Sequence, residues 1–134
     1  MKTLIVILSM IVPFSQALGV KSIPGIEDNL SVIQKALSEG DASTLSNYFD
    51  ATLEITVLDK QDVLDKTKAT ETLKNFFTKN KPRSYNSVHQ GSSKGSASHY
   101  TIGDMQTSGG NFRVYIYYKS NGNSILIQEI RIEK

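Results

Sequence analysis

The chain has 134 residues, which is enough for one domain and too few for two of ordinary size. Its 15 basic and 13 acidic residues leave a formal charge of +2, which argues against a nucleic-acid-binding protein. The chain has no cysteine, so disulfides, thiolate catalysis and zinc sites built on cysteine are excluded.

The first residues follow the order of a secretory signal peptide. Lys2 supplies a positive start, residues 4–12 form an apolar run without charge, and Pro13 breaks that run. Ser15 and Ala17 are small residues at the spacing of a cleavage site.

We therefore expect residues 1–17 to be a signal peptide, cleaved after Ala17 or, almost as well, after Gly19. The apolar run is shorter than the about 20 residues of a membrane-spanning helix, so we expect no transmembrane segment once the leader is removed. The expected product is secreted or periplasmic and forms a single domain over residues 20–134.

Two helices are predicted at the start of that domain. Apolar residues at spacings of four, three and four share one face of the first helix: Ile26, Leu30, Ile33 and Leu37. Gly40 ends this helix, and Asp41 can cap a short second helix that we expect to end near Tyr48-Phe49.

A strand pair and a third helix follow. Leu53, Ile55 and Val57 alternate with polar residues, as in a half-buried strand, and a turn leads to a brief strand around Val63. Asp65 can cap a third helix that ends before Pro82. The apolar face of this helix contains Ala69, Leu73, Phe76 and Phe77.

The remainder predicts four consecutive strands, at about 83–90, 97–107, 111–119 and 124–133. Asn121-Gly122 is typical of a tight hairpin turn between the last two. If residue 119 lies opposite residue 124, Arg113 faces Ile130, whereas a slip of one residue puts it opposite Glu129. The sequence leaves the register open.

This order predicts an α+β fold, with about three helices packed on a mainly antiparallel sheet of about six strands. Such lengths resemble the nuclear transport factor two-like (cystatin-like) superfamily, in which helices pack in the concave side of a curved sheet and form a cone.

Several motifs sharpen the resemblance. They are Gly40-Asp41, Leu45, Tyr48-Phe49-Asp50, His89-Gln90-Gly91-Ser92-Ser93, Tyr100, Ile102-Gly103 and Phe112-Arg113-Val114. Together they resemble a family of small secreted Bacteroidetes proteins that is known only as a domain of unknown function. The resemblance implies a cone-like fold and export, but no mechanism.

Few residues favour chemistry. His89 and His99 lie on neighbouring predicted strands, but a metal site needs about three converging ligands, so we expect neither a metal nor a cofactor. Lys79, Lys81 and Arg83 follow the third helix, where the negative end of the helix dipole is a sufficient explanation for basic residues.

Three functions remain open. The first is a non-catalytic module that binds a small molecule or a protein. The second is an enzyme similar to ketosteroid isomerases and polyketide cyclases, with Tyr85, His89, Tyr100 and Asp104 as candidate catalytic residues in the cone. The third is a structural, dimer-forming module of the cell envelope.

A filled cone would favour the first or the third function. Arg113, Tyr115 and Tyr117 share the polar face of their predicted strand, and this composition suits either a homodimer contact or a solvated sheet face. The pocket or interface candidates are Tyr48, Phe49, Phe76, Phe77, Arg113, Tyr115 and Tyr117.

Overall fold

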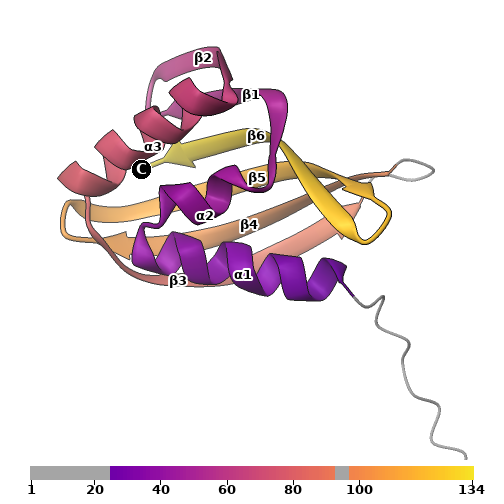
Figure 1. Cartoon of the computed structure of the whole chain (residues 1–134). Helices are drawn as coiled ribbons and strands as arrows, with labels where there is room; N and C mark the ends of the chain where they lie inside the picture. Colours follow the sequence, from indigo (N-terminus) through magenta and orange to yellow (C-terminus); the bar gives the residue numbers. More distant parts are fainter. Residues whose placement is uncertain (1–24, 93–96) are drawn as a thin grey trace, which may run out of the picture.

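A computed structural model describes residues 25–92 and 97–134, and the predicted signal peptide lies outside this part. Within it, three helices lie on one side of a six-stranded sheet (Figure 1). They are α1 (Ile26–Glu39), α2 (Ala42–Ser46) and α3 (Lys66–Lys79). None of these described helices is long and apolar enough to cross a membrane. The α+β prediction is confirmed.

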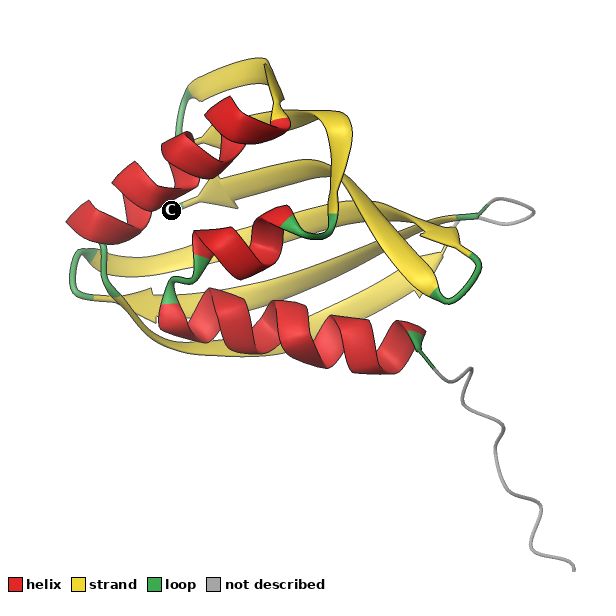
Figure 2. Cartoon of the chain, viewed as in Figure 1, coloured by secondary structure: helices red, strands yellow, loops and turns green. Residues whose placement is uncertain are grey.

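The sheet is mixed and curved, and it wraps around α1 and α2 (Figure 2). Its strands are β1 (Phe49–Val57), β2 (Lys60–Asp65), β3 (Pro82–Ser92), β4 (Ser98–Thr107), β5 (Gly110–Asn121) and β6 (Ser124–Glu133). They lie in the order β2-β1-β6-β5-β4-β3, and every neighbouring pair is antiparallel except β1 and β6. The parallel pair brings the first and last strands of the sequence together.

Capping contacts confirm three of the predicted helix boundaries, namely the end of α1 and the starts of α2 and α3. Gly40 ends α1 with a φ of 68°, a left-handed conformation that glycine adopts without strain. Asp41 Oδ1 accepts the Thr44 N–H at 3.0 Å, and Asp65 caps α3 in the same way. The predicted end of the second helix near Tyr48-Phe49 is wrong, because α2 ends at Ser46 and Phe49 already begins β1.

The core lies between the helices and the concave side of the sheet. The apolar face of α1 contributes Leu30, Ile33, Ala36 and Leu37, as the spacing predicts. The facing sheet residues are equally buried: Leu53, Ile55, Met105, Phe112, Val114, Ile116, Ile127, Ile130 and Ile132. Burial of such apolar faces is the main term that stabilises a domain of this size.

Neither of the two registers considered for the last hairpin is present in the structure. The turn residues are Gly122 and Asn123, with Asn121 paired to Ser124, because Gly122 adopts the positive φ of 61° that the turn requires. A bulge between Tyr117 and Tyr118 then shifts the pairing by one more residue. As a result Arg113 lies opposite Glu133, and neither Ile130 nor Glu129 is its partner.

Two tyrosine rings lie over glycines of the neighbouring strand, one on each side of the β3–β4 pair. A Cβ built on Gly103 would come within 2.2 Å of Tyr85 Cζ, and one on Gly91 within 2.5 Å of Tyr100 Oη. Neither glycine has a positive φ. Each glycine is therefore needed because a side chain would clash with a tyrosine ring, and not because of its backbone conformation. This packing accounts for Gly91, Tyr100 and Gly103 in the family-like motifs.

Candidate functional site

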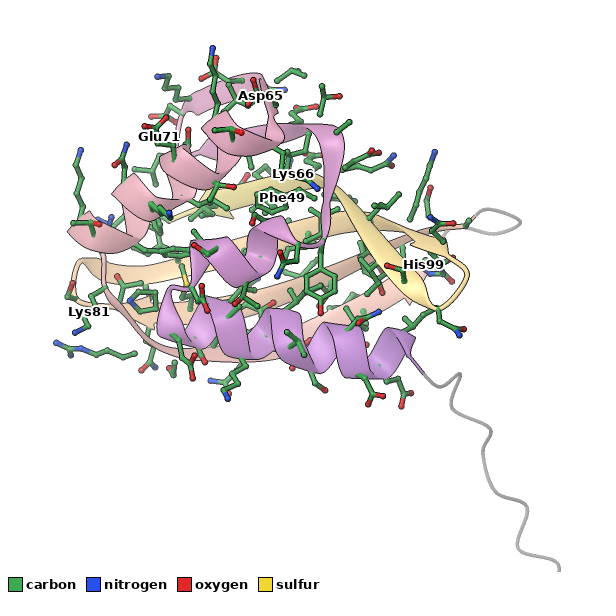
Figure 3. The ribbon with its side chains drawn as sticks, in the orientation of Figure 1. Phe49, Asp65, Lys66, Glu71, Lys81 and His99 are labelled. Atoms are coloured by element: carbon green, nitrogen blue, oxygen red, sulfur yellow. The ribbon has the colours of Figure 1, made fainter. Side chains whose placement is uncertain are left out.

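The interior of the cone is filled by side chains. Leu37, Phe49, Phe76 and Phe77 are each at most 6% exposed. The ring of Phe76 on α3 meets that of Phe112 on β5 edge-on, with 5.1 Å between centroids. Helix and sheet thus contact each other directly, and Figure 3 shows Phe49 among these inner side chains.

The four candidate catalytic residues do not converge. Tyr85 lies on the concave side, where its ring covers Gly103 and its hydroxyl oxygen is buried. Burial raises the pKa of Tyr85 to about 12, so its phenol stays neutral at physiological pH. His89, Tyr100 and Asp104 lie on the opposite side of the sheet, because β4 pairing aligns them with the outward residues of β3 and β5.

The two histidines are also on opposite sides. His89 is exposed, and its ring centroid lies 6.0 Å from that of Tyr100. His99 stacks on Tyr118 at 5.3 Å, with its Nε2 3.3 Å from Ser120 Oγ. Within residues 25–92 and 97–134, no group of three His, Cys, Asp or Glu side chains is placed to hold a metal ion.

The side of the sheet that faces away from the helices carries mixed polar and aromatic side chains. Three rows cross β4, β5 and β6 in register, and we call their residues the outer face. They are Tyr100, Tyr117 and Glu129; Ile102, Tyr115 and Arg131; and Asp104, Arg113 and Glu133. Arg113, Tyr115 and Tyr117 share one face of β5, opposite buried Phe112, Val114 and Ile116, as the alternation predicts. Arg113 is exposed and the two tyrosines are half-buried.

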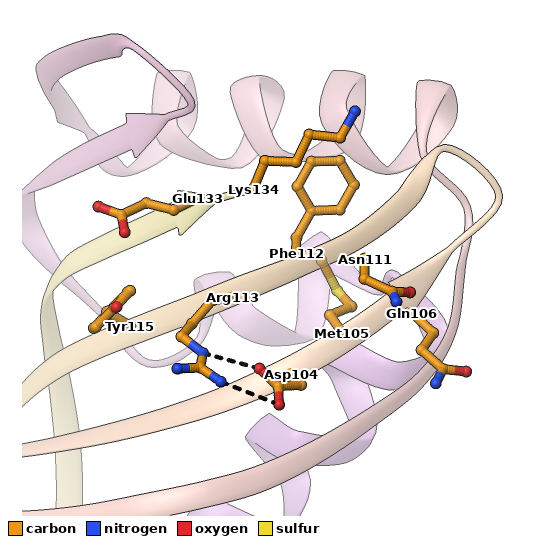
Figure 4. A pocket seen from close by; sticks show the side chains of 9 residues that line it. All are labelled: Asp104, Met105, Gln106, Asn111, Phe112, Arg113, Tyr115, Glu133 and Lys134. Atoms are coloured by element: carbon orange, nitrogen blue, oxygen red, sulfur yellow. Dashed lines mark hydrogen bonds and ion pairs between the residues drawn. The ribbon is translucent and has the colours of Figure 1, made fainter.

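One end of the outer face is hollowed. A depression of about 570 Å³ is lined by side chains around the β4–β5 pair and by the last two residues, Glu133 and Lys134 (Figure 4). Arg113 holds Asp104 through two contacts, with Nε donating to Oδ1 at 2.9 Å and Nη2 to Oδ2 at 3.3 Å. These hydrogen bonds raise the pKa of Arg113, so the guanidinium remains charged.

The side-chain charges of this hollow balance, since the carboxylates of Asp104 and Glu133 accompany the cations of Arg113 and Lys134. Next to it, the guanidinium of Arg131 lies 4.4 Å from the centre of the Tyr115 ring. Polar groups beside an aromatic ring can hold a partner that is neutral or of mixed charge. The geometry does not favour a strongly charged ligand here.

Two carboxylates share the neighbouring part of the outer side of the sheet. Glu54 on β1 lies directly opposite Glu129 on β6. Partial burial and the charge of Glu54 raise the pKa of Glu129. The sequence did not indicate the raised pKa of Glu129, because the β1–β6 pairing that places it opposite Glu54 is not local.

Tyr48, the last of the pocket or interface candidates, belongs to the packing of the domain. Its ring packs against the core, and its hydroxyl lies 3.5 Å from Asn29 Oδ1 between α1 and β1.

Sequence reasoning missed Ile102, Arg131 and Glu133 as part of the outer face. The alternation of charged and apolar residues along β6 indicates that Arg131 and Glu133 share one face of that strand, but only the correct register places this face beside Tyr115.

Comparison with known proteins identifies relatives. A family model described as Domain of unknown function (DUF4783) matches residues 30–133. A solved DUF4783 structure from Bacteroides ovatus is 36% identical, with a TM-score of 0.72, and the match covers 78% of this chain and 93% of that chain. Another from Bacteroides uniformis is 31% identical, with a TM-score of 0.71, covering 84% and 97%.

The fold has more distant neighbours. A designed protein of the nuclear transport factor two type is 13% identical, with a TM-score of 0.61, over 79% of this chain and 94% of that chain. At this identity the likeness shows the fold alone. No curated protein matches the chain. The resemblance drawn from the sequence motifs and the nuclear transport factor two-like fold are both confirmed.

Proposed function

The chain belongs to the DUF4783 family, and we propose that it is a non-catalytic binding module whose outer face binds a protein partner. One observation carries this proposal. The cone is filled by Leu37, Phe49, Phe76 and Phe77, whereas the opposite side of the sheet is open, hollowed and rich in tyrosine and arginine. Recognition is therefore better supported outside the cone than within it.

The composition of the outer face suits a protein surface. Tyrosine and arginine are enriched in protein interfaces, and they supply most of the residues that dominate binding energy. Tyr115 is held beneath Arg131, and Arg113 is held by Asp104. Side chains that are already ordered lose less conformational entropy when a partner binds.

The isomerase- or cyclase-like alternative has less support. Such chemistry needs an acid or base within hydrogen-bond reach of its partner group in one pocket. Here the sheet separates Tyr85 from His89, Tyr100 and Asp104.

The dimer-forming alternative stays within the proposal, because a second copy is one protein that the outer face could bind. The face carries both acidic and basic side chains, so two copies related by a two-fold axis can bring opposite charges together.

We also propose that the protein acts outside the cytoplasm, after removal of residues 1–17. The support is the signal-peptide order of the first residues. Mass spectrometry of the exported protein should give a chain that begins after Ala17 or Gly19. An intact Met1 in exported material would contradict export by cleavage.

Site-specific photo-crosslinking in the producing cells tests the binding proposal. A benzophenone amino acid in place of Tyr117 should form an adduct with a protein, and an adduct of twice the chain mass would identify a second copy. The matched control replaces Val32 on α1, which is 40% exposed on the helical side of the molecule. Absence of a protein adduct at Tyr117, or equal adducts at both positions, would overturn the proposal.

A further inference from the structure

Positive charge is concentrated on and directly after α3. Residues 66–83 contain six basic residues and one acidic residue, a net charge of +5, whereas the whole chain has +2. All six basic side chains are exposed: Lys66, Lys68, Lys74, Lys79, Lys81 and Arg83. The dipole of α3 explains basic residues only near its C-terminal end, so Lys66, Lys68 and Lys74 need another explanation.

The basic residues of the segment take part in none of the described ion pairs. In the part of the chain that the structure describes, the ion pairs are Lys60 with Asp62, Arg113 with Asp104, and Arg131 with Glu133. None of these described ion pairs includes a basic residue of the segment 66–83. Asp41 lies close enough to Lys74, and Asp50 to Lys66, for their charges to interact, so part of the positive charge is offset. The remaining excess of basic residues raises the local positive potential, which attracts anions.

Three of these lysines line two neighbouring hollows. A hollow of about 430 Å³ between α2 and α3 is lined by Lys66 and Lys74, and a hollow of about 370 Å³ near Gly40 is lined by Lys74 and Lys81. Because Lys74 lines both, the two hollows are neighbours along α3 and together form one lysine-lined surface. We call this the basic groove, and Figure 3 labels Lys66 and Lys81 at its two ends.

The groove also offers hydrogen-bond acceptors between its cations. Thr70 Oγ1 and Thr78 Oγ1 line it, and each donates its proton to a backbone carbonyl of α3. Their oxygen lone pairs are therefore left to accept from a ligand. Glu71 and Glu39 add carboxylate acceptors, one in each hollow.

This arrangement fits a ligand with separated anionic groups and hydroxyl donors between them. Lys66 and Lys74 are eight residues apart, about 12 Å along the helix axis. Proteins that bind single-stranded nucleic acid use exposed aromatic rings on which the bases stack. The aromatic residues of α3, Phe76 and Phe77, are instead buried.

Two other macromolecules fit less well. Lysine is depleted from protein interfaces, whose anchors are aromatic or arginine side chains. A membrane-surface helix exposes apolar residues, but the apolar face of α3 is buried in the core. From the groove's charges and acceptors we propose that it binds a linear anionic polysaccharide, at a site separate from the outer face.

Binding of defined polysaccharides tests this site. Heparin as the sulfated probe and polygalacturonate as the carboxylated probe should bind the wild type, and neutral dextran should not. Tighter binding of heparin would identify sulfate as the preferred group, and tighter binding of polygalacturonate would identify carboxylate. For either, affinity should fall as salt increases, because counterions are released on binding.

Matched triple variants give the critical comparison. Lys66→Gln, Lys74→Gln and Lys81→Gln together should weaken binding about tenfold or more at low salt, since each lost ion pair contributes modestly and the losses add. The control Lys35→Gln, Lys60→Gln and Lys119→Gln removes the same charge from exposed positions outside the groove and should change affinity less than about twofold. A triple Lys→Arg variant of the groove should retain binding.

Three results would overturn the proposal: no binding of either anionic polysaccharide, equal losses in the groove and control variants, or tighter binding to single-stranded DNA, polyglutamate or phosphatidylserine vesicles. The crosslinking experiment at Tyr117 is independent of all three, because the outer face lies on the other side of the sheet.

Discussion

A single methyl group added at Gly103 should destabilise the protein through Tyr85. An alanine Cβ there would lie 2.2 Å from Tyr85 Cζ and 2.3 Å from its hydroxyl oxygen, so the ring must leave its position. Because Gly103 has no positive φ, alanine itself fits the strand backbone. The expected cost is that of overpacking, about 1–3 kcal/mol, measured as a lower urea midpoint with an unchanged slope.

A double-mutant cycle isolates the cause. In a Tyr85→Ala background the clash is absent, so Gly103→Ala should cost almost nothing or add a few tenths of a kcal/mol of stability. The coupling energy should therefore approach the single-variant cost. Additive effects of the two substitutions would refute the explanation that Gly103 provides room for the ring. Gly91 and Tyr100 offer the same cycle on the outer side of the sheet.

Three further results are expected. Phe76→Ala should cost about 3–5 kcal/mol, since the buried ring joins α3 to the sheet, and an unchanged denaturation midpoint would contradict this packing. Glu129→Gln should stabilise the fold at pH 7, because burial and Glu54 raise the folded-state pKa of Glu129 above 4.5, and ionisation therefore costs stability as pH rises. The stability advantage of Glu129→Gln should shrink as the pH falls toward 4.5. A gain in stability that does not depend on pH would exclude the raised pKa of Glu129 as its cause. If two copies pair through the outer face, light scattering should give a dimer for the wild type and a monomer for Tyr115→Glu and Arg113→Glu; a monomeric wild type would rule out self-association.

Local signals in the sequence predicted most of the fold. The caps Asp41 and Asp65 and the C-terminal glycine Gly40 each act within a few residues, so their effect can be read without knowing the rest of the molecule. The same holds for the alternation along β5, which separates the buried residues from Arg113, Tyr115 and Tyr117. One boundary failed, at Phe49, where a residue expected at the end of a helix begins a strand.

Register could not be predicted, and the composition of the outer face depends on it. The turn lies at Gly122-Asn123 and a bulge follows Tyr117, and these two features together place Glu133 opposite Arg113. Neither feature has a clear signature in the residues, since Asn-Gly at 121–122 fits a turn that begins one residue earlier. The Arg113–Asp104 pair was missed for a related reason, because it depends on the register between β4 and β5.

The basic groove could not be predicted from the sequence either, because it depends on how the helices pack together. The sequence identifies Lys79, Lys81 and Arg83 as a cluster, but not that α2 lies beside α3 and forms a depression with Lys66 and Lys74. Likewise, the pattern indicates that Phe76 and Phe77 are buried, but only the structure shows that they fill the cone together with Leu37 and Phe49.

Amide chemical-shift mapping during titration with a library of small aromatic and charged fragments tests most directly whether recognition occurs on the outer face and not inside the cone. If recognition occurs on the outer face, the perturbed amides should cluster on β4, β5 and β6 around Asp104, Arg113, Tyr115 and Arg131, and Tyr115→Ala should abolish the perturbations. Perturbations that cluster instead around Ile33, Tyr85 and Thr101, on the concave side, would contradict it.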